Sequence, residues 1–134
     1  MIQNKVVVRY QNGEVLKGQT SDFLPTKPVF HLTLIDAPPG APSLVIQIAG
    51  IKAIFFVKDF VGNREREEVL GFSPEKPVIG RKIKVTFHDG ETLVGTTQGY
   101  DPNRLGFFII PADPASNNDR CFVVTSATKE IAFI

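Results

Sequence analysis

The chain has 134 residues, of which 43% are hydrophobic and 22% are charged, a balance typical of a folded globular protein that argues against extended disorder. Fifteen Lys and Arg residues oppose fourteen Asp and Glu residues, and a formal net charge of +1 gives no overall attraction to nucleic acid or to an anionic membrane. A single cysteine, Cys121, excludes an internal disulfide, and no apolar run approaches the length of a membrane span. The first residues do not resemble an export signal, so we expect a cytoplasmic protein that does not bind membranes.

One segment of the sequence occurs twice. Residues 5–57 align with residues 82–134 without a gap, so that Lys5 corresponds to Lys82 and Phe30 to Phe107. Positions that are apolar on both sides of this repeat alignment are expected in the core, because each unit must bury the same face. We therefore predict a first unit at residues 1–57, a connector at residues 58–80 and a second unit at residues 81–134.

Each unit has the pattern of five short strands. Its first strand alternates apolar and polar residues and ends in an Asn-Gly or Asp-Gly turn, which is the strongest short signal of a β-hairpin. Gly18 and Gly95 lie inside the second strand, where glycine permits the sharp bend that closes a small barrel. The strands that follow are predicted at residues 15–23, 29–34, 44–49 and 51–57, and again at 92–100, 106–110, 121–126 and 128–134. For the charged residues 62–71 of the connector, one or two helical turns and an exposed linker are both consistent with the sequence.

The order of these signals in each unit resembles the first Sm motif of Sm-like proteins. In the second unit the match runs through Val85, Phe87, Asp89, Gly90, Leu93, Gly95, Asp101 and Asn103. The resemblance implies an all-β protein made of two tandem, five-stranded Sm/SH3-like barrels. It also makes RNA binding an alternative function, but the basic residue that Sm proteins carry before a later glycine is replaced here by Ala49.

The whole chain is similar to a bacterial family of tandem units that in some proteins accompany PilZ or response-regulator domains. The similar stretches are residues 7–10, 53–60, 94–100 and 111–114. This similarity implies a regulatory or signalling adaptor, with a cyclic di-guanylate-linked effector as a further alternative. The Arg-x-x-x-Arg motif with which PilZ domains bind that nucleotide is absent.

The sequence contains no pattern typical of catalysis or of metal binding. Cys121 aligns with Leu44 on the inward-facing register of a strand, which predicts a buried thiol rather than a nucleophile. His31 and His88 lie at unrelated positions of the two units, and no metal-binding spacing of Cys or His is present. We therefore expect no enzyme, no cofactor and no metal, and instead a module that binds a protein partner or associates with itself.

Two groups of residues are candidates for this binding. The first group consists of polar residues in loops of the second unit, where rigid scaffolds commonly carry binding residues, although the same residue types also form ordinary turns. They are Tyr100, Asp101, Asn103, Arg104, Asn117, Asn118 and Arg120. The second group consists of apolar residues in registers that should face solvent, which is typical of an interface between barrels or between subunits. They are Val45, Phe55, Phe108, Ile110, Phe122 and Val124.

Overall fold

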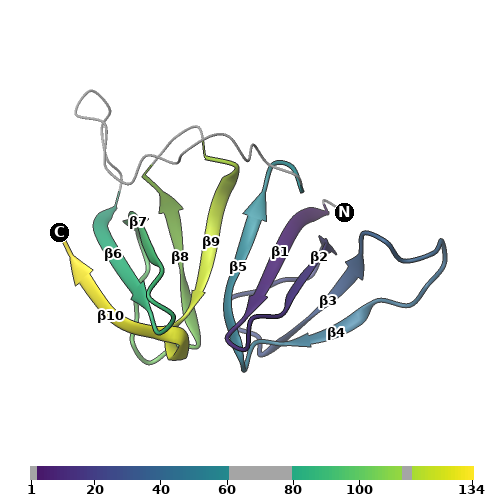
Figure 1. Cartoon of the computed structure of the whole chain (residues 1–134), viewed down its shortest axis with the longest axis horizontal. Coiled ribbons are helices and arrows are strands. Elements are labelled where there is room, and N and C mark those ends of the chain that lie inside the picture. Colours follow the sequence, from purple (N-terminus) through teal and green to yellow (C-terminus); the bar gives the residue numbers. More distant parts are fainter. Residues whose placement is uncertain (1–2, 61–79, 113–115) are drawn as a thin grey trace.

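The structure, a computed structural model, describes residues 3–60, 80–112 and 116–134 (Figure 1). The strands of the first half are β1 (Asn4–Tyr10), β2 (Val15–Thr20), β3 (Val29–Leu34), β4 (Leu44–Gln47) and β5 (Ile51–Val57). Those of the second half are β6 (Arg81–Phe87), β7 (Thr92–Thr97), β8 (Gly106–Pro111), β9 (Asn118–Val124) and β10 (Thr128–Phe133), with the short 3₁₀ helix η1 (Thr125–Ala127) before β10. The predicted all-β class is confirmed.

The ten strands form one open antiparallel sheet in the order β10-β6-β7-β8-β9-β5-β1-β2-β3-β4. Each half is therefore a continuous five-stranded section, and β9 pairs with β5 where the two sections meet. The sequence predicted two separate barrels, whereas the strands are joined edge to edge into a single sheet that curves at both ends (Figure 1). The connector residues 61–79, where a helical segment was considered, lie outside the described residues.

The duplication in the sequence is also present in the strand pairing. In the repeat alignment β6, β7 and β8 begin and end at the same positions as β1, β2 and β3, and the pair Val6 with Gly18 recurs as Ile83 with Gly95. Both glycines lie where the second strand approaches the third most closely, and a Cβ on Gly95 would overlap the carbonyl oxygen of Ile110. This close approach explains why both units have glycine at the same position.

Two hydrophobic cores lie side by side and share residues across the β5–β9 junction. The core of the first half includes Phe122 and Val124 from β9, and the core of the second half includes Val7 from β1 and Phe55 from β5. Every residue of β5 is buried, because one face of this strand packs on its own half and the other on the second half. Within the described residues η1 is the only helix, and it is too short to cross a membrane.

Candidate binding cleft between the two halves

The apolar residues predicted as an interface divide into two sets in the structure. Phe55, Phe122 and Val124 are at most 8% exposed at the junction of the halves, and Phe108 packs edge-on against Phe122 with ring centroids 5.2 Å apart. Val45 and Ile110 lie elsewhere and are 60% and 49% exposed. The first four residues therefore connect the halves, whereas the last two face solvent.

A buried lysine adds a polar contact to this junction. The side chain of Lys52 is 9% exposed, and its ammonium lies 2.8 Å from Asp89 and 3.1 Å from Glu91, both in the β6–β7 turn of the other half. The ammonium also lies 4.8 Å from the centre of the Phe87 ring. The hydrogen bond from Lys52 and the backbone hydrogen bond from Glu91 hold the pKa of Asp89 below its ordinary value.

A bulge in β5 directs Lys52 toward this turn. The pairing of β1 with β5 shifts register between Arg9 and Tyr10, so that Arg9 lies opposite Ala53 and Tyr10 opposite Ile51. Lys52 is the extra residue between them, and a bulged residue can turn its side chain out of the regular alternation of a strand. Glu91, which recurs as Glu14 in the first unit, is therefore paired with a lysine of the other half.

Beside the junction the two halves enclose a cleft of about 600 Å³. Its floor is the outer face of β1 and β5, with Val7, Phe55 and Val57, and Phe60 also lines it. The β7 residues Thr92 and Leu93, together with the neighbouring Glu91, close the side that belongs to the second half. Val7, Phe55 and Val57 are at most 8% exposed and belong to the second core, so the groups that face the cleft are mainly polar.

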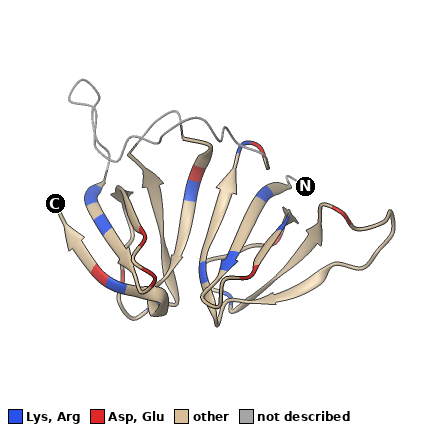
Figure 2. Ribbon diagram, viewed as in Figure 1, with Lys and Arg blue, Asp and Glu red and all other residues tan. Residues whose placement is uncertain are grey.

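Basic side chains line the side of the cleft that belongs to the first half. Arg9 and Lys17 contribute to its wall, and the Arg9 guanidinium lies 5.8 Å from the centre of the Phe55 ring. Lys5 follows the same face of β1, with its ammonium 6.0 Å from the centre of the Phe60 ring. Figure 2 shows the basic positions of β1 in blue. The acidic residue Glu91 is already paired with Lys52. The cleft therefore combines a mainly polar surface over buried apolar side chains with more basic than acidic residues.

Of the seven polar residues predicted as a ligand site, Asn117 and Asn118 line this cleft. The Asn117 amide donates a hydrogen bond of 2.8 Å to the carbonyl oxygen of Asp59, and its side-chain oxygen accepts one of 3.1 Å from the Asp59 amide. These two bonds fix the orientation of Asn117 at the wall of the cleft. The backbone N–H of Asn118 donates to the Ser116 hydroxyl, 3.1 Å away.

The structure does not bring the other five predicted residues into this site. The ring of Tyr100 packs edge-on against Phe107 and Phe133, with centroids 4.9 and 5.5 Å away. In the same loop, Asp101 accepts a hydrogen bond from the Asn103 backbone and pairs with Arg104 at 3.7 Å. Arg120 stacks over the rings of Phe56 and Phe108, at 4.3 and 4.8 Å from their centres. These contacts stabilise the loop and the junction.

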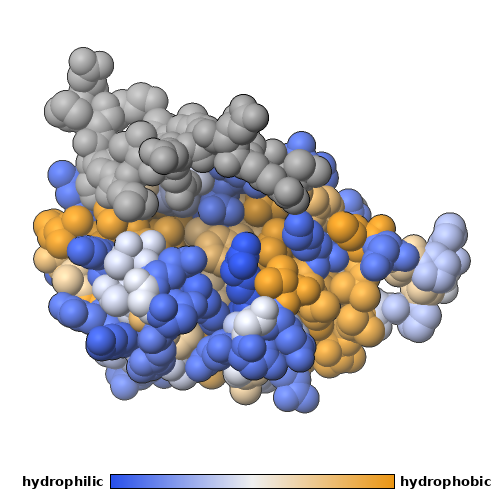
Figure 3. Space-filling view, in the orientation of Figure 1, coloured by the Kyte–Doolittle hydropathy of each residue, from blue (hydrophilic) through white to orange (hydrophobic). Residues whose placement is uncertain are grey.

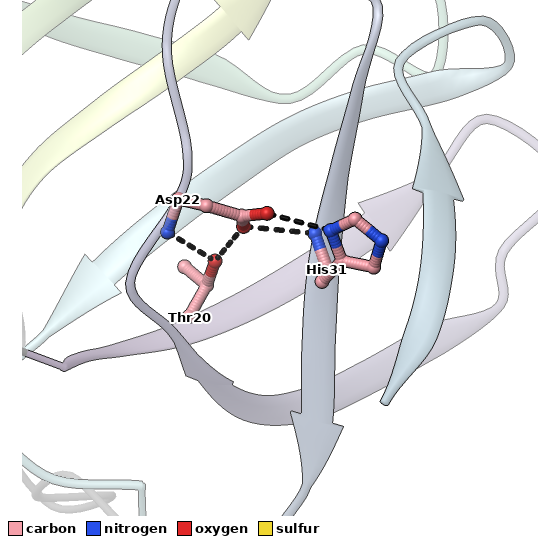
Figure 4. Close-up of polar contacts among 3 residues, drawn as sticks. All are labelled: Thr20, Asp22 and His31. Atoms are coloured by element: carbon pink, nitrogen blue, oxygen red, sulfur yellow. Dashed lines mark hydrogen bonds and ion pairs between the residues drawn. The ribbon is translucent and has the colours of Figure 1, made fainter. Parts of the chain in front are cut away.

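One further polar cluster, which no pattern in the sequence indicates, places Asp22 between Thr20 and His31 (Figure 4). The Asp22 carboxylate accepts hydrogen bonds from the Thr20 hydroxyl at 3.1 Å and from the His31 backbone at 2.9 Å, and it lies 2.6 Å from Nδ1 of the His31 ring. Burial alone would raise the pKa of Asp22, but these bonds outweigh it and the pKa is lowered. The Thr20 hydroxyl points to Asp22 and not to the imidazole, so the cluster fastens the chain after β2 to β3 and lacks the geometry of a nucleophile with its base.

No other arrangement suited to catalysis is found in the described parts of the chain. Among these residues, no three His, Cys, Asp or Glu side chains gather in a way that could hold a metal ion. Cys121 is fully buried in the second core, as the sequence predicted. What the cleft can offer chemically is two amides, basic side chains and the small exposed parts of apolar and aromatic residues.

The fold and the cleft define an all-β protein with a duplicated five-stranded unit and a cleft between the two units. The chain belongs to the DUF6982 family, a family of unknown function whose model matches residues 2–134. No curated protein matches the sequence, and no solved structure matches it.

Proposed function

We propose that this protein is a non-catalytic binding module of a regulatory kind, in which two small Sm/SH3-like barrels hold a ligand between them. The ligand has an anionic group and an apolar or aromatic body. The observation that carries this proposal is the cleft of about 600 Å³, with Phe55 in its floor and Arg9 and Lys17 in its wall.

The electrostatics of the cleft support an anionic ligand. On the outer face of β1 and β2, Lys5, Arg9 and Lys17 gather positive charge in a protein whose formal net charge is only +1. A guanidinium next to an aromatic ring can pair with an anion through its N–H groups while the ring packs against the body of the ligand. Asn117 supplies a fixed amide at the opposite wall.

The aromatic sulfonate 8-anilinonaphthalene-1-sulfonate is a suitable probe, because it carries both an anionic group and an apolar body. We expect its fluorescence to report one saturable site. The double variant Arg9→Gln/Lys17→Gln should bind the probe about thirtyfold more weakly, since each of the two lost charge-assisted contacts removes on the order of 1 kcal/mol. A matched control is Lys84→Gln, which removes an exposed lysine from β6, outside the cleft. Equal affinity of the double variant and the control would refute the proposal.

Two more specific ligands can be distinguished with the same assay. Cyclic di-guanylate has aromatic bases and two phosphates, and displacement of the probe by this nucleotide would support a signalling effector. RNA binding is the second candidate function. Lys5 and Arg9 lie on either side of Val7 on one face of β1, next to the rings of Phe55 and Phe60. Sites that bind nucleic acid combine basic and aromatic residues in this way. Binding of a short single-stranded RNA that weakens steeply with salt and is lost in Arg9→Gln/Lys17→Gln would favour RNA.

A further inference from the structure

The ten-stranded sheet ends in two open edges, one at β4 and one at β10. The Ile48 amide donates to the Pro28 carbonyl, so it points toward β3. Successive N–H groups of an antiparallel strand point to opposite sides, so the N–H of Val45, three residues earlier, points away from β3. In the same way, the Ile134 amide points toward β6, because it donates to the Lys82 carbonyl. The N–H of the preceding residue, Phe133, therefore points away from β6. Both ends of the sheet therefore present backbone groups that suit pairing with another strand.

The junction inside the chain shows what such a pairing looks like in this protein. The repeat alignment makes β4 the counterpart of β9, and β10 the counterpart of β5. Within the chain, β5 and β9 pair with each other and bury their side chains. The counterparts β10 and β4 have the same position in their own halves, but neither has a partner at its outer edge among the strands that the structure describes.

The difference in exposure between the two sets of counterparts is large. Phe122 of β9 is 1% exposed, whereas its counterpart Val45 of β4 is 60% exposed. Phe56 of β5 is 4% exposed, whereas its counterpart Phe133 of β10 is 38% exposed. Apolar side chains also reach the surface at the end of the molecule that carries the C-terminus (Figure 3). The two ends therefore have apolar residues like those of the junction, and no strand among the described residues covers them.

We propose that β10 of one copy of this protein pairs with β4 of a second copy and repeats the β5–β9 junction between chains. The pairs Ile54 with Phe122 and Phe55 with Cys121 set the register. Transferred through the repeat alignment, they place Ile131 opposite Val45 of the second copy and Ala132 opposite its Leu44. This inference does not depend on what the cleft binds.

The ion cluster of the junction has its own counterparts at the two ends. The pairing of β6 with β10 shifts register between Thr128 and Glu130, which makes Lys129 the bulged residue of β10, as Lys52 is of β5. The partner Glu91 corresponds to Glu14, and the ring of Phe87 corresponds to that of Tyr10. Lys129 and Glu14 are both exposed, and the repeated junction brings Lys129 of one copy to Glu14 of the next.

The aromatic contacts of the junction recur in the same way. Phe122 packs on Phe23, with ring centroids 5.0 Å apart. The counterpart of Phe23 is Tyr100, whose ring already packs on Phe133 next to the open edge of β10. The repeated junction therefore places Val45 of the second copy against Tyr100 and Phe133. This gives Tyr100, which the sequence singled out, a role in self-association rather than in ligand binding.

Because the two edges are different, the contact joins the head of one chain to the tail of the next. Such a contact generates a closed ring or an open chain of copies, and a single contact of this kind has no two-fold symmetry. A strand-edge contact between β4 and β4, or between β10 and β10, would have that symmetry. This difference makes the proposal testable by mixing variants.

The test measures the mass in solution of two variants that each block one edge. In Val45→Pro and in Phe133→Pro the proline removes an N–H that faces away from the sheet, which an edge strand tolerates. Val45→Thr and Phe133→Ala are the matched controls, since they change the side chain and keep the N–H. Light scattering should give assemblies larger than one chain for the unmodified protein and for Val45→Thr. Phe133→Ala should still associate, but with a lower affinity. Each proline variant should have the mass of a monomer.

An equimolar mixture of the two proline variants should form a dimer, because each contributes its intact edge. A monomeric unmodified protein at the concentrations at which the proline variants are measured would overturn the proposal. So would a Phe133→Pro variant that dimerises alone, because a β4–β4 contact would then be responsible.

A charge exchange tests the register without altering the backbone. Lys129→Glu and Glu14→Lys should each weaken the association about tenfold or more, and the double variant should regain most of the loss, as expected for a close pair at an interface. Both residues are exposed in the single chain, so thermal unfolding of the monomeric Val45→Pro background should be unaffected by either change. Equal association in both single variants and the double variant would refute this register.

Discussion

The ion pairs of the buried Lys52 with Asp89 and Glu91 can be broken by replacing either the lysine or the two acids. We expect these two changes to lower the free energy of unfolding by different amounts. The lysine side chain is 9% exposed, whereas the carboxylates of Asp89 and Glu91 are 55% and 54% exposed. Replacing both acids by their amides, in Asp89→Asn/Glu91→Gln, leaves an ammonium without a counter-charge at a site with little water. Removing one side of a buried pair costs about 3–5 kcal/mol, and the exposed acids place this case at about 3 kcal/mol.

Replacing the lysine instead should cost much less. In Lys52→Met the two carboxylates remain hydrated at the surface, and the methionine side chain fills the space beside the Phe87 ring. We expect a change below about 1 kcal/mol in the free energy of unfolding. Urea denaturation measures both variants, and the difference corresponds to roughly 8 °C in Tm. If Lys52→Met were as unstable as the double amide variant, attraction by the lysine would be holding the halves together and the reasoning would be wrong.

Three further predictions concern the strands, the junction and the Asp22 cluster. Gly95→Ala should lower the free energy of unfolding by about 2 kcal/mol or more in urea denaturation, because its Cβ would overlap the Ile110 carbonyl, whereas Gly99→Ala, with no atom within 4 Å, should be close to neutral. Phe122→Ala should cost about 3–5 kcal/mol by the same measurement, and a loss below about 1 kcal/mol would show that Phe122 is not buried between the halves. Asp22→Asn should lower Tm at neutral pH. Because the pKa of Asp22 is lowered from 3.8 on folding, the advantage of the unmodified protein should persist above that pH and disappear as the pH falls below it; a difference that grows in acid would contradict the cause given.

Local signals in the sequence predicted most of the strands. The alternation in residues 6–10 and the Asn-Gly and Asp-Gly turns are properties of neighbouring residues, and the hairpins β1–β2 and β6–β7 form where they indicate. The second strand of each unit ends three residues before the prediction, at Thr20 rather than 23 and at Thr97 rather than 100. In the first unit Asp22 then binds the Thr20 hydroxyl and the His31 backbone. β9 begins at Asn118, before the predicted residue 121, and it pairs with β5 as well as with β8.

The pairing of β5 with β9 could not be predicted from local signals. Nothing in residues 51–57 specifies which strand lies along the outer edge of β5, and that pairing joins the two halves. The cleft depends on it, and so does the role of Lys52, whose bulge has no mark in the sequence. One signal was present, since Phe55 and Phe122 are apolar in registers that should face solvent. The sequence left open whether they join the two halves or two subunits, and the structure places them between the halves.

The two halves form one sheet through the pairing of β5 with β9, and proton NMR can detect this pairing in solution. The amide of Thr125 donates to the Leu105 carbonyl, so it points to β8. Every second N–H along a strand points to the same side, so the N–H of Cys121 points to β8 as well. Cys121 and Phe55, which lie opposite each other, are therefore a pair without hydrogen bonds between them. In such a pair the α-protons lie close together. The account predicts a strong α-proton contact between Phe55 and Cys121 and another between Ala53 and Val123. A spectrum with the α-proton contacts of β1–β2 and β6–β7 intact and both of these missing would contradict it.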